Sequence, residues 1–212
     1  MPNHDPTIPQ GVGLQPGSLR SVQRPLLVVL EGPYDVEFFK RISAILHADD
    51  PSIPSLANLE CNRQIIFIPL GGASLVSCIG WLGSLGHPLF LLVDSETPPE
   101  TERRRKVLGQ VASGDMVVRL TSHRSTENYL YAKAVNTACG VEIEFGDHDD
   151  VVELVAMARY RQRGSSVPWE RIAPTRRRGC RKRAKRTLNL RATELMTPEL
   201  LTERDPDGEV VG

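Results

Sequence analysis

The sequence lacks the features of disulfide-bonded, zinc-binding, secreted and membrane-spanning proteins. Its four cysteines stand singly, without the paired spacing of a zinc site or a disulfide framework, so we expect reduced cytoplasmic thiols. Residues 3–5 are polar and prolines follow them in place of an apolar run, so no signal peptide is predicted. Residues 75–93 are nearly apolar over a membrane-spanning length, but glycines and Pro88 interrupt them. We therefore expect a buried helix, a turn and a strand there, and no membrane contact.

The chain also lacks a net charge and an internal repeat. Its 26 basic and 26 acidic residues cancel, so the total charge favours no particular partner. The charges are nevertheless unevenly distributed, because residues 147–150 are mostly acidic and residues 171–191 are almost purely basic. A polyanion could therefore bind locally to the basic segment.

Length and composition predict one globular domain with irregular ends. A chain of 212 residues with 40% hydrophobic and 25% charged residues has room for one core, and its 16 prolines and 17 glycines indicate loose ends. We expect a disordered tail over residues 1–24 and a folded domain over residues 25–163. Residues 164–212 form a Pro- and Arg-rich basic segment that is expected to regain a short helix only from Thr187 onward.

Short apolar runs alternate with stretches of helical spacing, which predicts an α/β fold with a parallel sheet of about four strands. Helices are expected on both faces of the sheet, joined by right-handed crossovers, with Trp81 in the core. Ligands of such sheets bind beyond the carboxyl ends of the strands. The expected strands are residues 26–30, 65–70, 89–93 and 116–120, and the expected helices are residues 36–46, 75–85, 100–111, 127–139 and 150–161.

Acidic residues follow the first and third expected strands. Glu31 and Asp35 flank the turn into the first helix, and Asp94 and Glu96 follow the third strand on one side of an extended backbone. The structural alternative is that Asp35 caps a helix, that Glu31 is solvated and that the second pair lies in a polar loop. Neighbouring carboxylates repel unless a cation lies between them. Hard oxygen ligands favour Mg²⁺ or Mn²⁺, which can activate water and stabilise charge in phosphoryl transfer.

Two motifs, Glu31-Gly-Pro-Tyr-Asp35 and Asp94-Ser-Glu96, together resemble the paired acidic motifs of Toprim domains, which occur in topoisomerases, primases and nucleases. The later segment 125–130, Ser-Thr-Glu-Asn-Tyr-Leu, is similar to the Ser-x-Glu motif of the overcoming-lysogenization-defect (OLD) family of nucleases. The resemblance covers roughly residues 26–130 and implies a Rossmann-like Toprim core. The sequence has Asp-x-Glu where Toprim domains usually have Asp-x-Asp, so the metal preference stays open.

The resemblance also implies roles for individual residues. Two ions, Mg²⁺ or Mn²⁺, would bind at the acidic site, and a nearby lysine, Lys185 or Lys182, would stabilise the transition state. OLD nucleases commonly carry an ATPase domain, but this sequence has no Gly-x-x-x-x-Gly-Lys-Ser/Thr loop and is expected to have no room for that domain. ATP would then be supplied through a separate ATPase partner or not be needed. The implied metal ligands are Glu31, Asp35, Asp94, Glu96 and Glu127, with Ser125 in support, and Glu31 and Asp94 are also expected to be catalytic.

Two further segments could contact phosphate. Gly71-Gly72-Ala73-Ser74 follows the second strand and opens a helix, where backbone N–H groups can meet a phosphate, although a tight turn is the simpler explanation. The basic segment can neutralise several DNA phosphates with strong salt dependence, and its alternative is a disordered solubilising tail. The candidate nucleic-acid-binding residues are Arg176, Arg177, Arg178, Arg181, Arg183 and Arg186.

The function expected from this resemblance is that of a cytoplasmic Toprim-type endonuclease, a divalent-metal-dependent hydrolase of DNA phosphodiester bonds. The alternative enzyme is a primase-type nucleotidyl transferase, because the same metal site can support strand synthesis or cleavage. The alternative outside enzymes is a non-catalytic module that binds nucleic acid or a protein partner. The complete acidic set counts against that module.

Overall fold

Four apolar pentapeptides form the central sheet of the structure, a computed structural model that describes residues 24–70, 75–111, 116–206 and 208. All strand pairings are parallel, and the order across the sheet is β2-β1-β3-β4. The central strands β1 and β3 are covered on both faces, which explains their continuous apolar sequences. The predicted α/β fold with a parallel sheet is confirmed. The strands are β1 (Leu26–Leu30), β2 (Ile65–Pro69), β3 (Leu89–Val93) and β4 (Met116–Leu120).

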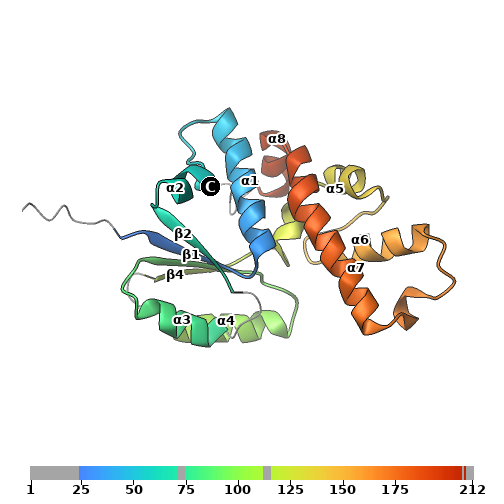
Figure 1. Ribbon diagram of the computed structural model, residues 1–212, viewed down its shortest axis with the longest axis horizontal. Coiled ribbons are helices and arrows are strands. Elements are labelled where there is room, and N and C mark those ends of the chain that lie inside the picture. Colours follow the sequence, from blue (N-terminus) through green and yellow to red (C-terminus); the bar gives the residue numbers. More distant parts are fainter. Residues whose placement is uncertain (1–23, 71–74, 112–115, 207, 209–212) are drawn as a thin grey trace, which may run out of the picture.

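Helices cover both faces of the sheet (Figure 1). Helices α1 (Pro33–Asp49) and α2 (Leu56–Cys61) lie on one face, and α3 (Leu75–Gly83) and α4 (Glu100–Val111) lie on the other. Each helix lies between two strands in the sequence, as parallel connections require. None of the helices within the described ranges has the length and apolar character needed to cross a membrane.

The face toward α3 and α4 holds the smaller of two apolar cores. Ile79, Leu82 and Leu108 pack there against side chains of β1 and β3, and each is at most 5% exposed. Trp81 is 65% exposed, so the expectation that it lies in the core is wrong. A helix turns about 100° per residue, and the side chain of Trp81 is therefore directed away from the side of α3 that carries Ile79 and Leu82.

The opposite face holds the larger core, which joins α1 to the C-terminal half of the chain. Phe38 and Ile42 of α1 meet Tyr129, Val155 and Leu188 there, all of them almost fully buried. The last part of the chain is thus folded onto the α/β unit. Its elements are α5 (Ala132–Cys139), α6 (Val151–Gln162), α7 (Pro174–Thr187) and α8 (Pro198–Arg204), with short helical turns η1 (Thr126–Tyr129), η2 (Trp169–Arg171), η3 (Leu188–Ala192) and η4 (Thr193–Leu195).

The basic segment is an ordered helix in the structure, and this differs from the prediction. Helix α7 begins at Pro174 and packs against α6, whereas a helical pattern was expected only from Thr187 onward. Arg, Lys and Ala favour helices, but only Ala184 in α7 and Leu188 just after it are fully buried, so the segment shows no apolar periodicity. The tail, residues 1–23, and the proposed phosphate-binding turn, residues 71–74, lie outside the described residues.

The single helix expected over residues 127–139 is instead two elements, η1 and α5. Leu130 and Tyr131 between them have extended backbone conformations, which changes the direction of the chain. The helix expected over residues 150–161 is present as α6, and the side chain of Asp150 accepts a hydrogen bond from the Glu153 N–H at its start, as an acidic N-cap should.

The packing of the larger core predicts that alanine substitutions of two leucines close in sequence lower the free energy of unfolding by different amounts. Leu188→Ala removes a side chain with no exposed surface and should lower the free energy of unfolding by roughly 2–5 kcal/mol. Leu195→Ala is the control, because Leu195 is 43% exposed, and it should change stability by about 0.5 kcal/mol or less. Urea unfolding measures both. Equal effects would contradict the packing of the C-terminal half against α1.

Candidate functional site

The carboxyl ends of β1 and β3 bring acidic side chains together. Glu31 follows β1, Asp94 follows β3, and the backbone N–H of Asp94 donates a hydrogen bond to Glu31 Oε1 at 3.2 Å. Asp35 lies in the first turn of α1, where Pro33 suits the first helical position and the extended Gly32 starts the helix. Asp35 and Asp94 are only 2% and 6% exposed. This group lies beyond the carboxyl edge of the sheet, where ligands of such folds bind.

The loop after β4 adds Glu127 to this group. Ser125 Oγ donates to Glu127 Oε2 at 2.9 Å, and Asn189 Nδ2 donates to Glu127 Oε1 at 2.9 Å. Thr126 joins the other two acids, because its N–H donates to Asp94 Oδ1 and its hydroxyl donates to Asp35 Oδ1, both at 3.2 Å. We name Glu31, Asp35, Asp94 and Glu127 the carboxylate cluster.

Helix α7 provides a cation for the cluster. Lys185 Nζ lies 3.0 Å from Asp35 Oδ1 and 3.4 Å from Glu127 Oε1, and these carboxylates raise the pKa of Lys185. Lys182, one helical turn earlier, is exposed and lines the crevice outside the cluster. Of the two lysines proposed from the sequence, the structure therefore brings Lys185 into contact with the carboxylates.

Arg104 of α4 is a second cation at the cluster, and sequence reasoning missed it. Its guanidinium donates to Glu31 and to the backbone carbonyl of Asp94, the latter at 2.6 Å. Glu100, four residues earlier in the same helix, accepts from Arg104 Nε at 3.4 Å. Thr126 and Asn189 were also missed. Their hydrogen-bond partners are far away in sequence, so the only signal for Thr126 was its place inside the Ser-x-Glu motif.

Glu96 lies beside the cluster but is not part of it. Its carboxylate is 3.3 Å from Arg124 Nε and 3.9 Å from Arg104 Nη2, at the edge of the crevice. The argument that alternation places Asp94 and Glu96 on one side of a strand does not apply, because β3 ends at Val93 and Glu96 has a φ of 59°. A left-handed residue other than glycine at this position is a local strain.

Burial and like charge act together on the cluster. Burial is the main cause of a raised pKa at Glu31, Asp35 and Asp94. For Asp94 the neighbouring charges of Glu31, Glu127 and Asp35 add to burial and hold its pKa well above the usual range. With all four carboxylates ionised, the cluster would carry more negative charge than Lys185 and Arg104 balance.

The donor set suits a hard divalent cation, although the carboxylates are now held apart by cationic side chains. No group of three or more His, Cys, Asp or Glu side chains in the described part of the chain is positioned to hold a metal ion. Asp35 Oδ2, however, is buried and has no hydrogen-bond partner among the described residues. A Cβ at Gly32 would lie 3.4 Å from that oxygen, so the glycine leaves space beside it. An all-oxygen set with a free buried carboxylate oxygen fits Mg²⁺ or Mn²⁺.

The cluster opens into a crevice of about 360 Å³ between the sheet edge and α7. The crevice is lined by the acids Glu31, Asp94, Glu96, Glu127 and Asp150, by Arg124, and by four cationic residues of α7, namely Arg178, Arg181, Lys182 and Lys185. Both signs of charge therefore border a space that an anionic substrate could enter.

The six arginines proposed to bind nucleic acid are divided among three places. Arg177 and Arg181 form ion pairs with Glu153, and Arg181 also pairs with Asp150 at 2.9 Å, so both hold α7 against α6. Arg178 faces the crevice, and Arg186 is exposed. Arg176 and Arg183 lie toward the C-terminal half of α6, where Arg176 stacks over the ring of Tyr160 at 5.5 Å.

Comparisons with known proteins identify no relative: no family model matches this chain, and neither a curated protein nor a solved structure matches it. The resemblance to Toprim domains and OLD-family nucleases therefore stays a prediction from the sequence motifs.

The raised pKa of Asp94 predicts that Asp94→Asn stabilises the metal-free protein. The folded state holds the Asp94 proton more tightly than the unfolded state, so Asp94 reduces stability once the pH rises above the unfolded pKa of about 4. The gain in melting temperature for Asp94→Asn should be near zero at pH 3.5 and increase toward pH 8 in EDTA. Thr126 N–H can still donate to the asparagine oxygen. A lower melting temperature at pH 8 would contradict the charge repulsion.

The two lysines are predicted to differ in their contribution to stability. Lys185→Met leaves buried carboxylates without their cation and should lower the free energy of unfolding by roughly 3–5 kcal/mol at pH 8. Lys182→Met is the matched control, since Lys182 is exposed in the same helix, and its unfolding curve should overlay that of the parent. Chemical denaturation in EDTA compares them.

Proposed function

We propose that this protein is a Toprim-type, divalent-metal-dependent nuclease that hydrolyses DNA phosphodiester bonds at the carboxylate cluster. The observation that carries the proposal is the convergence of Glu31, Asp35, Asp94 and Glu127 at one edge of the sheet, with a buried carboxylate oxygen that has no partner in the described part of the chain. A surplus of buried negative charge is costly for a protein that binds no cation. Such a surplus is useful for a site that binds divalent metal.

The cluster residues would hold one or two ions of Mg²⁺ or Mn²⁺, with Ser125 orienting Glu127 through its hydrogen bond. When bound, such ions activate water and neutralise charge that develops on a transferring phosphoryl group. Thr126 fixes the carboxylates of Asp35 and Asp94 at a defined separation, and Arg104 fixes Glu31. These contacts preorganise the cluster before a substrate arrives.

The cationic residues that line the crevice favour an anionic substrate. Lys185 carries a firmly held positive charge at the cluster, where it can stabilise negative charge on a phosphate oxygen. Arg178 and Lys182 extend the positive charge along the crevice and can neutralise further phosphates of the same strand. DNA as the polyanion, a separate ATPase as a partner and action in the cytoplasm are parts of the proposal that rest on the OLD-like motifs.

Incubation of supercoiled plasmid with Mg²⁺ or Mn²⁺ tests the proposal. The parent should convert the plasmid to nicked or linear forms, and EDTA should stop the conversion. Asp94→Asn and Glu127→Gln should each reduce the rate to about one-hundredth or less, since they remove negative charge from the metal-binding set. Because Asp94→Asn is predicted to stabilise the metal-free fold, a melting curve of the variant separates loss of activity from unfolding.

The matched control is Glu37→Gln, which neutralises an acid two residues from Asp35 in the same helix. The side chain of Glu37 is 46% exposed and pairs only loosely with Arg41, at 4.0 Å. This variant should cleave plasmid at the parent rate. Metal-dependent incorporation of nucleotides without cleavage would instead favour strand synthesis. If the folded parent catalyses neither reaction, with or without ATP, the proposal is wrong.

A further inference from the structure

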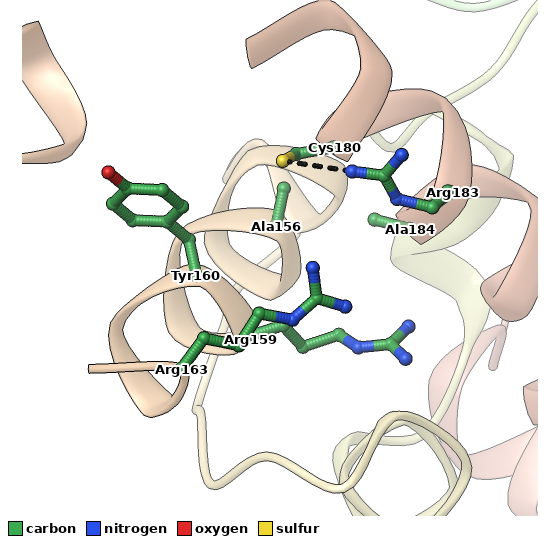
Figure 2. Close-up of a pocket in the computed structure, with 7 residues that line it drawn as sticks. All are labelled: Ala156, Arg159, Tyr160, Arg163, Cys180, Arg183 and Ala184. Carbon is green, nitrogen blue, oxygen red and sulfur yellow. Dashed lines mark hydrogen bonds between the residues drawn. The ribbon is translucent and has the colours of Figure 1, made fainter. Parts of the chain in front are cut away.

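A second, smaller pocket lies between α6 and α7. Its volume is about 30 Å³, room for one or two water molecules or for the oxygens of a small anion. Figure 2 shows the side chains of Arg159 and Arg163 extending beside each other from α6, with the Arg183 guanidinium above them on α7. Ala156 and Ala184 keep the space between the helices open, since neither side chain extends past Cβ.

The guanidinium groups of Arg159, Arg163 and Arg183 define this arginine pocket, and none of them has an acidic partner among the described residues. Within the parts of the chain that the structure describes, Arg159 donates to Thr187 Oγ1 at 3.2 Å and Arg183 donates to Cys180 Sγ at 3.3 Å, both neutral acceptors. By contrast, Arg177 and Arg181 in the same helix are paired with the carboxylates of Glu153 and Asp150. The acids of α6 thus lie at its start, and the pocket lies at its end.

Stabilisation of a helix end does not explain the convergence. Cations in the last turn of α6 interact favourably with the helix dipole, which accounts for Arg159 and Arg161 as single residues. It does not account for Arg183, which comes from the neighbouring helix and is directed to the same space. Three arginines from neighbouring parts of the fold thus border one small space, and an anion there would reduce the repulsion between their like charges. The planar fork of guanidinium donors matches the oxygens of a phosphate.

The surface of α7 connects this pocket to the crevice. At about 100° per residue, the basic residues of α7 follow one another around roughly half of its circumference. The series starts at the carboxylate cluster, reaches the arginine pocket at Arg183 and ends at Arg176 over the ring of Tyr160, and every member after the first is exposed. In order around the helix it is Lys185, Arg178, Lys182, Arg186, Arg183 and Arg176.

We infer that the arginine pocket binds a backbone phosphate of the nucleic acid strand whose scissile bond lies at the carboxylate cluster. The strand crosses α7 along the basic series and is held on both sides of the helix, about one helix diameter of 10–12 Å apart. The inference rests on the proposed function, since it names how the same substrate is held. The pocket takes part in binding only and has no role in the chemical step.

Binding of labelled duplex DNA in EDTA tests the inference without cleavage. The double variant Arg163→Gln/Arg183→Gln removes two guanidiniums from the pocket and leaves the crevice residues unchanged. Its dissociation constant should rise several-fold. The slope of log affinity against log salt should decrease in magnitude by about 0.9, the value for one lost phosphate contact on duplex DNA. Arg161→Gln removes one positive charge from an exposed side chain of α6 that does not line the pocket, and it should bind like the parent.

The outcomes separate this inference from the nuclease proposal. If the double variant binds DNA with the parent's affinity and salt slope, the inference is wrong, while plasmid cleavage by the parent would leave the nuclease proposal intact. An equal loss with Arg161→Gln would show general electrostatic attraction and would also overturn it. Inorganic phosphate that raises the melting temperature of the parent but not of the double variant, without a difference in DNA affinity, would indicate a free-phosphate site instead. If the double variant binds DNA less tightly than the parent but the parent never cleaves DNA, only the nuclease proposal is wrong.

Discussion

The burial of several carboxylates at one edge of the sheet constrains the rest of the structure. Asp35, Asp94 and Glu127 are each at most 6% exposed, and they lie together at one edge of the sheet. Such a group is tolerated only if donors and cations surround it. The backbone N–H of Thr126 supplies one donor, and Lys185 supplies a full charge at 3.0 Å from Asp35. The loop after β4 and helix α7 dock where the strands end, and there they supply a donor and a cation to the cluster.

This constraint makes the basic segment part of the folded domain. Helix α7 has very little apolar surface of its own, and Ala184 is its one fully buried residue. Ion pairs of Arg181 with Asp150 and Glu153 attach it to α6, and Leu188 in the following turn inserts into the larger core. The same turn directs Asn189 toward Glu127. A helix that looks solvated in sequence is thus held by charge at its start and by packing at its end.

The basic residues of α7 fall into two groups, those that form ion pairs within the domain and those that do not. Arg177 and Arg181 face the start of α6 and are neutralised there, and Lys185 is paired with the carboxylate cluster. Arg178, Lys182, Arg183 and Arg186 have no acidic partner among the described residues. Under the proposed function, one helix would therefore stabilise the domain and bind a polyanion at the same time. Single substitutions in α7 should be interpreted by the direction of each side chain, because equal changes of net charge have different physical consequences.

The sequence by itself determined the parallel sheet and the acids at its carboxyl edge. Apolar pentapeptides covered on both faces are a local signal, and Glu31 and Asp94 come directly after two of them, so their meeting point follows from strand direction alone. The sequence did not predict that α7 is ordered from Pro174, because an Arg-rich helix has no apolar periodicity. It did not predict that Trp81 is exposed either, because the sequence of an apolar helix does not show which side is buried. Only the tertiary structure selected Lys185 over Lys182 and added Arg104 and Asn189. Arg104 lies 73 residues from Glu31 and Asn189 lies 62 from Glu127, so their contacts depend on how helices dock and not on any local pattern.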